Sequence, residues 1–485
     1  MNRQIRIAGI GVIVLFLLLF FQINYLQVVR ASSLDHNHLN SRLALAKFTT
    51  KRGDIISADG VILAHSVPTS DSLKWLRTYP TNDLFGQVTG YVSFTYGLEG
   101  AERTFDADLT GANSPLQLPH SLRDLTVKQD KSQTVTLTLS NKLQQLAKTQ
   151  LGSRKGAVVA LDPSTGAILA LWSNPSFDPN PLAVHDQNAV RSYWQAENAN
   201  PDQPLLAASF RRRFFPGSTF KTITASAVFD KQPSLALKPY PTLSALPLPQ
   251  TGGQSLRNFG GEVCGGLLPD LFRVSCNTGF AQIGIDLGGP ALADEATSFG
   301  FDQTPPLDLP EVAQSFFPPG SSFVHDIPGL AKSAIGQQNV QAVPLSMALV
   351  ASAIANGGVI MKPHILDRVS NSQGQVVRTY QPAPWITATS AATATQMTQL
   401  MVSVVQSGTG TSAQIPGIQV AGKTGTAQTG NNSIHAWFVC FAPATQPKVA
   451  VAVLVENQPA TNEATGGAIA APIAKAILQS ALQGP

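Results

Sequence analysis

The chain has 485 residues, of which 13% are charged, and a formal net charge of +4. At roughly 150 residues per domain, this length suggests about three units. The sequence holds no basic stripe with interleaved aromatic residues, so nucleic-acid binding has no support. None of its three cysteines lies in a Cys-x-x-Cys pair, and no histidine is spaced to complete a zinc site. We therefore expect no metal and no cofactor.

The first thirty residues carry an unbroken apolar run, Ile7–Phe21, that continues to residue 29 with three polar interruptions. As a helix, the shorter run spans about 22 Å and the longer about 35 Å, against a hydrocarbon core of ~30 Å. We predict a transmembrane anchor over residues 7–29, after a short cytoplasmic tail at 1–6, because the stretch is long and rich in Leu and Phe.

The alternative is a cleavable signal peptide, for which Val29-Arg30-Ala31 is a passable cleavage site. Both interpretations place residues 31–485 outside the cytoplasm. The anchor interpretation predicts a single-pass protein of the cell membrane with its C-terminal bulk extracytoplasmic.

After the anchor, early strands precede a helical middle and late strands. Asp-Gly and Pro-x-x-Gly turn signals predict two hairpins. This order predicts an α+β fold in which one antiparallel sheet, with helices on its faces, is shared by both ends of the chain. We expect a small β-rich N-terminal module over residues 30–150 and a larger domain over 151–485. The predicted elements, in chain order, are a stalk at 31–50, a hairpin at Lys51–Ser66, a strand at Gln133–Ser140 followed by a helix, a hairpin at Gly156–Ser173, helical patches to about residue 370, strands at 415–428, 434–442 and 447–456, and a helix at Ile469–Gln483.

Ser218 and Lys221 stand three residues apart in FPGSTFKT, after a Pro-Gly pair that suits a turn into a helix. On a helix, residues three apart share one face. A serine hydroxyl is a weak nucleophile, and a lysine amine activates it when burial or a second cation lowers the pKa of the amine. One such match is expected by chance, and a helix cap followed by a surface lysine explains the bare motif better.

Two further motifs follow in order, and each occurs once: Ser275-Cys276-Asn277 and Lys423-Thr424-Gly425-Thr426. Ser-x-x-Lys, Ser-x-Asn and Lys-Thr-Gly in this order form the pattern of the penicillin-recognising serine acyltransferases. Three unique matches in the right order are far more specific than any one of them. The set predicts acyl transfer at Ser218.

Each motif has a chemical role in this prediction. We expect Ser275 to relay a proton and Asn277 to hold a substrate amide. Lys423 supplies a second cation, which favours a neutral Lys221 and attracts a carboxylate.

The hydroxyls of Thr424 and Thr426 are predicted to bind the terminal carboxylate of a peptide, and Gly425 to let the substrate backbone lie close. The N–H groups of Ser218 and Thr426 are the expected oxyanion donors. A peptide ending in D-Ala-D-Ala offers such a carboxylate beside a scissile amide. The predicted reaction is acylation of Ser218, release of D-Ala, and attack by an acceptor amine.

Residues 417–424 (GIQVAGKT) also match the phosphate-binding pattern G-x-x-x-x-G-K-[ST], so an ATPase is an alternative from another class. A phosphate loop leads directly into a helix, whereas GTAQTGNNS follows here. The loop interior, Ile-Gln-Val, is typical of a strand. The segment also lies on the side of the membrane away from ATP, and we reject the ATPase.

The sequence resembles the class B penicillin-binding proteins, and among them the short actinobacterial penicillin-binding protein A type. Arg52–Ala64 and Thr89–Gly111 are similar to the non-penicillin-binding module of that family. Segments similar to its transpeptidase domain are KGAVVALDPSTGAILAL, Ile335–Gly358 and His435–Pro443.

The resemblance implies a peptidoglycan D,D-transpeptidase with the penicillin-binding transpeptidase and serine β-lactamase-like fold. It also implies inhibition by β-lactams and work beside a lipid-II polymerase of the FtsW/RodA type, with divisome or elongasome proteins. The family's nucleophile, base, Ser-x-Asn and Lys-Thr-Gly residues correspond to the positions named above.

Several alternatives stay open at this point. A D,D-carboxypeptidase uses the same site with water as acceptor, and a non-catalytic penicillin sensor or scaffold would tolerate loss of Lys221 or Lys423. Cys276 stands where β-lactamases carry Asp, which counts mildly against a β-lactamase, and region 30–150 is too short for a glycosyltransferase domain. Cys264 and Cys276 either form a disulfide that braces the site or are two small buried residues.

Overall fold

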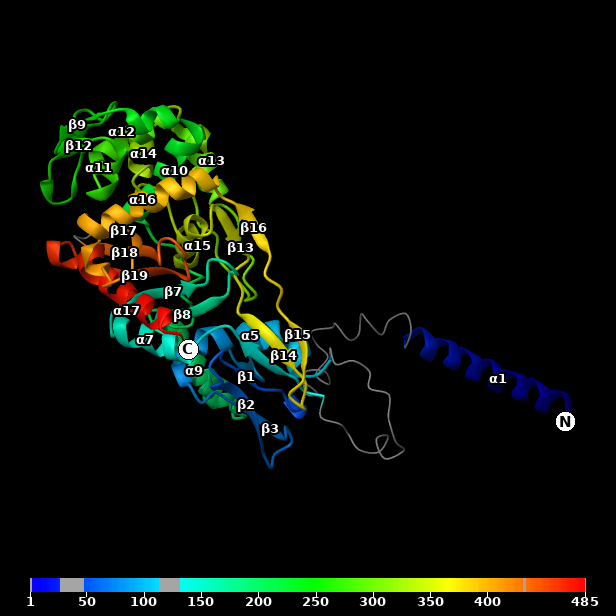
Figure 1. Cartoon of the computed structure of the whole chain (residues 1–485). Helices are drawn as coiled ribbons and strands as arrows, with labels where there is room; N and C mark the ends of the chain where they lie inside the picture. The colour runs from blue at the N-terminus through cyan, green and yellow to red at the C-terminus, as the bar shows by residue number, and fades with distance from the viewer. Residues whose placement is uncertain (1, 27–47, 113–130, 431–432, 485) are drawn as a thin grey trace. The chain divides into compact units, whose positions relative to one another are not determined.

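The computed structural model describes residues 2–26, 48–112, 131–430 and 433–484 (Figure 1). It divides into two units, each of which is described here by itself. One comprises Met1–Lys51 and Val67–Leu76, and the other comprises Arg52–Ser66 and Arg77–Pro485.

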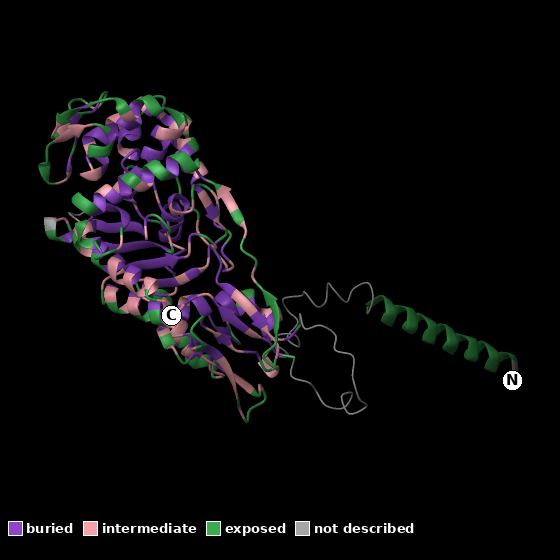
Figure 2. Ribbon diagram, in the orientation of Figure 1, coloured by how far each residue is buried: buried purple, intermediate pink, exposed green. Residues whose placement is uncertain are grey.

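The first unit contains the helix α1 (Asn2–Asn24), whose apolar side chains are exposed along its whole length (Figure 2). By length and composition, its segment Arg3–Asn24 is a candidate membrane span, as the apolar run predicts. Most of the predicted stalk at 31–50 lies outside the described residues.

The second unit is built on a five-stranded antiparallel sheet in the order β17-β18-β19-β7-β8. Its strands are β17 (Ala421–Gly430), β18 (Ser433–Ala442), β19 (Val449–Pro459), β7 (Gly156–Leu161) and β8 (Ile168–Asn174). Early and late strands therefore share one sheet, as the sequence predicts. The first late strand begins at Ala421 and not at 415, because Pro416 and Gly417 (φ +75°) form a turn that Ile415 and Ile418 close.

Helices cover this sheet because its central strands are buried residue after residue. All six residues of β7 and the first eight of β19 are buried, which requires cover on both faces. The helices α15 (Pro344–Ala355) and α17 (Ala471–Leu482) pack against β19, and α7 (Asn141–Leu151) packs against β8 and α17. Figure 2 shows the buried strands beneath helices whose outer sides are exposed.

A second, mainly helical region carries the segment between β8 and β17. Its α10 (Lys221–Lys231) packs mainly against α12 (Asn277–Leu287), α13 (Gly289–Ser298) and α16 (Ala391–Ser407). Completing the region are α11 (Leu268–Arg273) and α14 (Ile327–Ser333). Figure 1 shows these helices gathered beyond β17, at one edge of the main sheet. The helical region therefore borders β17.

The smaller sheet contains the predicted first hairpin, β1 (Ile55–Ile56) with β2 (Ile62–Pro68). β6 (Thr134–Leu137) lies parallel to β1. Two strands from much later in the chain, β14 (Leu366–Ser370) and β15 (Val376–Thr379), extend this sheet beside β6. A division of the sequence at 150/151 does not anticipate this return of the chain to the N-terminal sheet.

Packing explains why arginine and glycine stand at positions 52 and 53, at the start of the first hairpin. Arg52 is 3% exposed and donates to the Glu102 carboxylate at 2.9 Å and to Asp106 at 2.5 Å. Arg77, also buried, donates to the other oxygen of Glu102 at 2.5 Å. A Cβ on Gly53 would lie 1.9 Å from the Gln133 carbonyl oxygen, so only glycine fits there.

The remaining α-helices and strands include β3 (Trp75–Thr78), the last strand of the smaller sheet. The others are α4 (Gly86–Thr89), β4 (Val92–Ser93), β5 (Gly97–Leu98), α5 (Gly100–Thr104), α6 (Asp106–Leu109), α8 (Asn180–Ala183), α9 (Gln187–Ala199), β9 (Tyr240–Leu243), β10 (Ala245–Pro247), β11 (Ser255–Arg257), β12 (Cys264–Gly266), β13 (Val359–Met361) and β16 (Pro384–Thr387).

Candidate active site

Ser218 lies in a single 3-10 turn, η3 (Gly217–Phe220), that leads directly into α10. The serine is half-buried, whereas Lys221, the first residue of α10, is completely buried. Residues three apart eclipse one another in such a turn. The predicted helix start is therefore present in the structure, with a reachable hydroxyl and a desolvated amine one turn apart.

The turn that carries Ser218 packs directly against the edge strand β17. A Cβ on Gly217 (φ +52°) would lie 2.9 Å from Ala427. A Cβ on Gly425 would lie 2.8 Å from the Thr219 methyl group and 2.9 Å from the Pro216 carbonyl oxygen. Glycine at 425 thus permits close packing of strand and turn, which is a different reason from the substrate approach that the sequence suggests.

The Ser-x-Asn motif forms a second turn, between α11 and α12. Ser275 adopts a left-handed backbone conformation (φ +60°) that non-glycine residues rarely hold. Cys276 forms a disulfide with Cys264, so the bridged alternative is the one the structure contains. The turn is braced by a covalent link to β12.

Two lysine amines converge on Ser275. Lys221 Nζ donates to the Ser275 carbonyl oxygen at 2.7 Å and lies 3.4 Å from its hydroxyl. Lys423 Nζ donates to the same hydroxyl at 2.8 Å. Asn277 Oδ1 accepts from Lys221 Nζ at 2.7 Å. The structure therefore brings one residue of each motif, together with Asn277, into a single hydrogen-bonded group.

The electrostatics of this group favour a neutral base. Burial lowers the pKa of Lys221 well below its ordinary value, and the charge of Lys423 lowers it further. Burial alone lowers the pKa of Lys423 to about 7. Both amines lie within hydrogen-bond distance of the Ser275 hydroxyl, which links them in one network.

Thr424 and Thr426 differ in their surroundings. Thr424 is buried, and its hydroxyl forms a hydrogen bond of 2.6 Å with that of Thr409. Thr426 is half-buried. Thr409 lies in no motif, so no sequence signal points to it. β17 is the last strand of its sheet, and an edge strand is the kind of element with which an extended peptide can pair.

The phosphate-loop match has no structural basis. Its Gly-Lys-Thr lies inside β17 and not at the start of a helix, and the chain continues into β18. Among the described residues, no group of three or more His, Cys, Asp or Glu is placed to hold a metal ion.

The residues of β18 beside the site serve packing. His435 is buried, accepts the N–H of Asn457 at 3.3 Å and lies edge-on to Phe214. Trp437 is completely buried and donates its indole N–H to the Phe215 carbonyl oxygen at 2.9 Å, three residues before Ser218. The indole thus ties β18 to the segment that carries the serine.

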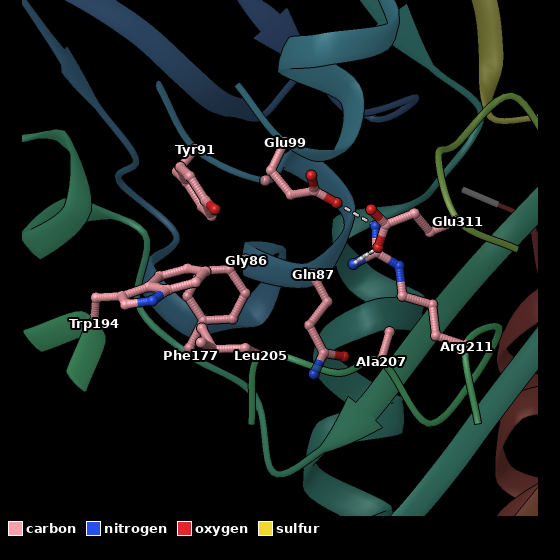
Figure 3. A pocket seen from close by; sticks show the side chains of 11 residues that line it. Gly86, Gln87, Tyr91, Glu99, Phe177, Trp194, Leu205, Ala207, Arg211 and Glu311 are labelled. Atoms are coloured by element: carbon pink, nitrogen blue, oxygen red, sulfur yellow. Dashed lines mark hydrogen bonds and ion pairs between the residues drawn. The ribbon is translucent and has the colours of Figure 1, made fainter. Parts of the chain in front are cut away.

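A cavity of about 260 Å³ lies away from these motifs. Figure 3 shows Tyr91, Phe177 and Trp194 on one side of it and Arg211 between Glu99 and Glu311 on the other. Its lining includes none of the motif residues. Arg211 forms ion pairs with Glu99 and Glu311 there. Since no motif residue lines it, this cavity forms no part of the candidate active site.

Comparison with known proteins agrees with this geometry. Residues 156–479 match the family model of the penicillin binding protein transpeptidase domain, and residues 52–135 match that of the penicillin binding protein A dimerisation domain. Over its whole length, the chain is 38% identical to the peptidoglycan D,D-transpeptidase PbpA of Mycolicibacterium smegmatis, 99% of which is covered. It is equally similar to PbpA of Mycobacterium tuberculosis, 100% of which is covered.

Solved structures give the same result. The ceftriaxone acyl-enzyme complex of penicillin-binding protein A from M. tuberculosis superposes with a TM-score of 0.82 at 37% identity, covering 90% of this chain and all of that one. The D,D-transpeptidase domain of a peptidoglycan glycosyltransferase from Eggerthella lenta gives 0.78 at 33% identity, covering 90% and 99%. With its motifs gathered into one site on this fold, the chain belongs to the penicillin-binding protein transpeptidase family.

Proposed function

We propose that this protein is a peptidoglycan D,D-transpeptidase that uses Ser218 as its nucleophile. The observation that carries the proposal is the contact of both Lys221 and Lys423 with Ser275, in a site whose Ser-x-x-Lys motif supplies a half-buried serine. Relatives that this chain matches over its whole length are named D,D-transpeptidases, and a solved relative forms an acyl-enzyme with a β-lactam.

The acylation step follows from the arrangement. The Ser218 hydroxyl oxygen attacks the carbonyl carbon of the penultimate D-Ala, and its proton passes to the neutral amine of Lys221. The N–H groups of Ser218 and Thr426 stabilise the oxyanion. When the C–N bond breaks, the leaving D-Ala nitrogen takes a proton through the Ser275 hydroxyl, which both amines contact.

The transfer step reverses these roles. An acceptor amine attacks the Ser218 ester carbonyl, gives its surplus proton to the site, and forms the new amide as the serine oxygen leaves and is reprotonated. Asn277 and the edge strand β17 hold the substrate backbone, while Lys423, Thr424 and Thr426 draw its terminal carboxylate. A β-lactam occupies the same position but keeps its leaving group attached, so its acyl-enzyme persists.

A peptide assay tests the reaction. The full chain in detergent is given a synthetic stem peptide ending in D-Ala-D-Ala, with and without an acceptor peptide, and the products are identified by mass spectrometry. We expect a cross-linked product and release of D-Ala with wild type, and neither with Ser218→Ala, while the exposed-site variant Ser321→Ala stays active. Hydrolysis without cross-linking at any acceptor concentration would establish a carboxypeptidase instead.

We further propose that the protein is a single-pass cell-membrane protein, anchored by α1 with residues 31–485 extracytoplasmic, and that it works beside a lipid-II polymerase of the FtsW/RodA type. The apolar helix Arg3–Asn24 and the family relationship support this arrangement. The module at 30–150 then takes no direct part in acylation. Site-specific cross-linking from α1 in intact cells tests the partner: capture of the polymerase supports the proposal, and its absence with every cross-linker position contradicts it.

A further inference from the structure

The first backbone N–H groups of α12 donate hydrogen bonds to a residue that lies outside all three motifs. Asn258, which follows β11, is 6% exposed. Its Oδ1 accepts the backbone N–H of Asn277 and that of Thr278, each at 2.9 Å. One amide oxygen thus binds the two residues that begin the helix.

The helix needs this external acceptor because its own N-cap cannot supply one. Cys276 precedes α12, and its side chain makes no capping hydrogen bond. The sulfur is instead bonded to Cys264. Because the first N–H groups of a helix have no partner within it, they require an acceptor from elsewhere.

The other half of the Asn258 amide fixes its orientation. Nδ2 donates to the carbonyl oxygens of Leu243 at 2.8 Å and Glu262 at 2.9 Å. The Asn258 backbone N–H also donates to the Ser244 carbonyl oxygen. Nδ2 also donates to the Thr278 hydroxyl oxygen at 3.3 Å. With Nδ2 facing these acceptors, Oδ1 is the atom that accepts the N–H groups of Asn277 and Thr278.

The neighbouring residue orients the side chain of Asn277. The Arg257 carbonyl oxygen accepts from Asn277 Nδ2 at 3.2 Å. This contact turns Asn277 Oδ1 toward Lys221 Nζ, 2.7 Å away. The Arg257-Asn258 pair therefore holds both the backbone and the side chain of the motif asparagine.

We propose that Asn258 is a positioning residue for acylation, which acts by setting Asn277 against Lys221. The inference rests on the proposed function of Ser218 and Lys221. Removing the Asn258 amide leaves the N–H groups of Asn277 and Thr278 and two carbonyl groups without partners, so the start of α12 moves to find new ones. Asn277 is the first residue of α12, and Ser275 lies two residues before it. A shift of the helix start therefore changes the contacts that both residues make with the Lys221 amine.

The substitution Asn258→Asp distinguishes the acceptor role of the Asn258 side chain from its donor role. An aspartate at 258 keeps an acceptor for the helix N–H groups, and its charge suits a helix N-terminus. It loses both donors and faces the Leu243 and Glu262 carbonyl oxygens instead. Asn258→Asp should therefore retain more of the acylation rate than Asn258→Ala.

A second asparagine supplies a matched control. Asn180 accepts the N–H of Tyr79 at 2.9 Å and donates to the Tyr79 carbonyl oxygen at 2.9 Å and to Asp178 at 2.7 Å. It makes a similar set of bonds but touches no motif residue. Asn180→Ala should lower thermal stability without slowing acylation.

The experiment measures acylation of the full chain in detergent by a fluorescent penicillin over a range of concentrations, which separates initial binding from the acylation rate constant. Asn258→Ala is expected to lower that rate constant about 10- to 100-fold, since small misplacements of catalytic groups have effects of this size. The rate constant of Asn258→Asp should lie between those of Asn258→Ala and wild type. Asn180→Ala should lose about as much Tm as Asn258→Ala, but its acylation rate constant should stay within about twofold of wild type.

Acylation of Asn258→Ala within about twofold of wild type, or a slowing no greater than that of Asn180→Ala, would overturn the inference alone. If the alanine variant does not fold, the same comparison is made with Asn258→Asp, and an unchanged rate constant overturns it equally. Failure of the wild type to take any label would overturn the proposed function as well.

Discussion

Lys423, on the strand β17, has its Nζ 2.8 Å from the Ser275 hydroxyl. Lys221 Nζ lies 3.4 Å from the same hydroxyl, so both amines are within reach of the Ser275 hydroxyl proton. Both amines are completely buried, and each also lies 5.5 Å from an aromatic ring, Phe280 for Lys221 and Phe272 for Lys423. Burial and the charge of Lys423 both lower the pKa of Lys221, so the pH dependence of acylation is a readout of the site.

Removal of Lys423 should shift the pH profile of acylation. Its charge lowers the pKa of Lys221, so Lys423→Met raises that pKa. Because neutral Lys221 is the active form of the base, the acid limb of the profile moves to higher pH and the rate at neutral pH falls. Acylation rates measured across the pH range check this. Lys238→Met, at a surface ion pair, is the control, and an acid limb that stays in place or moves to lower pH contradicts the account.

Stability should fall at alkaline pH because of a buried carboxyl. Burial, with the nearby charge of Asp230, raises the pKa of Glu295 from 4.5 to about 8. The folded state therefore holds a proton that the unfolded state releases, so the stabilisation is complete below pH 4.5 and is lost as the pH rises through about 8. Thermal unfolding across this range should show a smaller decline for Glu295→Gln. An equal decline in wild type and Glu295→Gln, with the exposed variant Glu463→Gln as reference, would refute this role.

The buried ion network of the N-terminal module should be costly to break. Glu102 is completely buried between Arg52 and Arg77, so Glu102→Ala leaves two buried guanidinium groups without their main partner. We expect a loss of about 3–5 kcal/mol in the free energy of unfolding. Chemical denaturation measures it, with Lys238→Ala at a surface pair expected to cost about 0–1 kcal/mol. Equal costs for the two variants would contradict this assignment.

The Cys264–Cys276 disulfide should stabilise the Ser275 turn. A bridge over so short a loop is expected to contribute about 3 kcal/mol. Reduction, or paired serine substitutions, should lower Tm and slow acylation, whereas Cys440→Ser should leave the acylation rate close to that of wild type. A thiol count in denaturant without reductant should find one free thiol, that of Cys440. Three free thiols in the same count would rule the bridge out.

Much of the fold follows from local sequence signals. The Asp-Gly turn at residues 59–60 and the Pro-x-x-Gly turn at residues 163–166 predict hairpins that the structure contains. The return of β14 and β15 to the N-terminal sheet has no such signal, because pairing between Val369 and Val135 depends on contacts more than 200 residues apart. The order of elements predicts that early and late strands share the main sheet, but nothing in the residues of β14 and β15 marks them as partners of β6.

The residues of the candidate site likewise fall into those that the sequence predicts and those that it does not. Three ordered motifs predict which residues meet, since each contributes a group that the chemistry requires. The supports of the motifs could not be predicted: Thr409 beside Thr424 and Asn258 beside Asn277 are ordinary polar residues in loops. The sequence motif predicts Gly425 for the approach of a substrate backbone, which stays a prediction; the structure adds that a Cβ there would crowd Thr219, Pro216 and Trp437.

The most direct test of the account is the mass of the protein after incubation with penicillin G. We predict that the full chain gains the mass of one penicillin molecule, that the adduct maps to the peptide containing Ser218, and that Ser218→Ala gains none. No mass gain on wild type, or an equal gain on Ser218→Ala, would contradict the assignment of Ser218 as the acylated nucleophile.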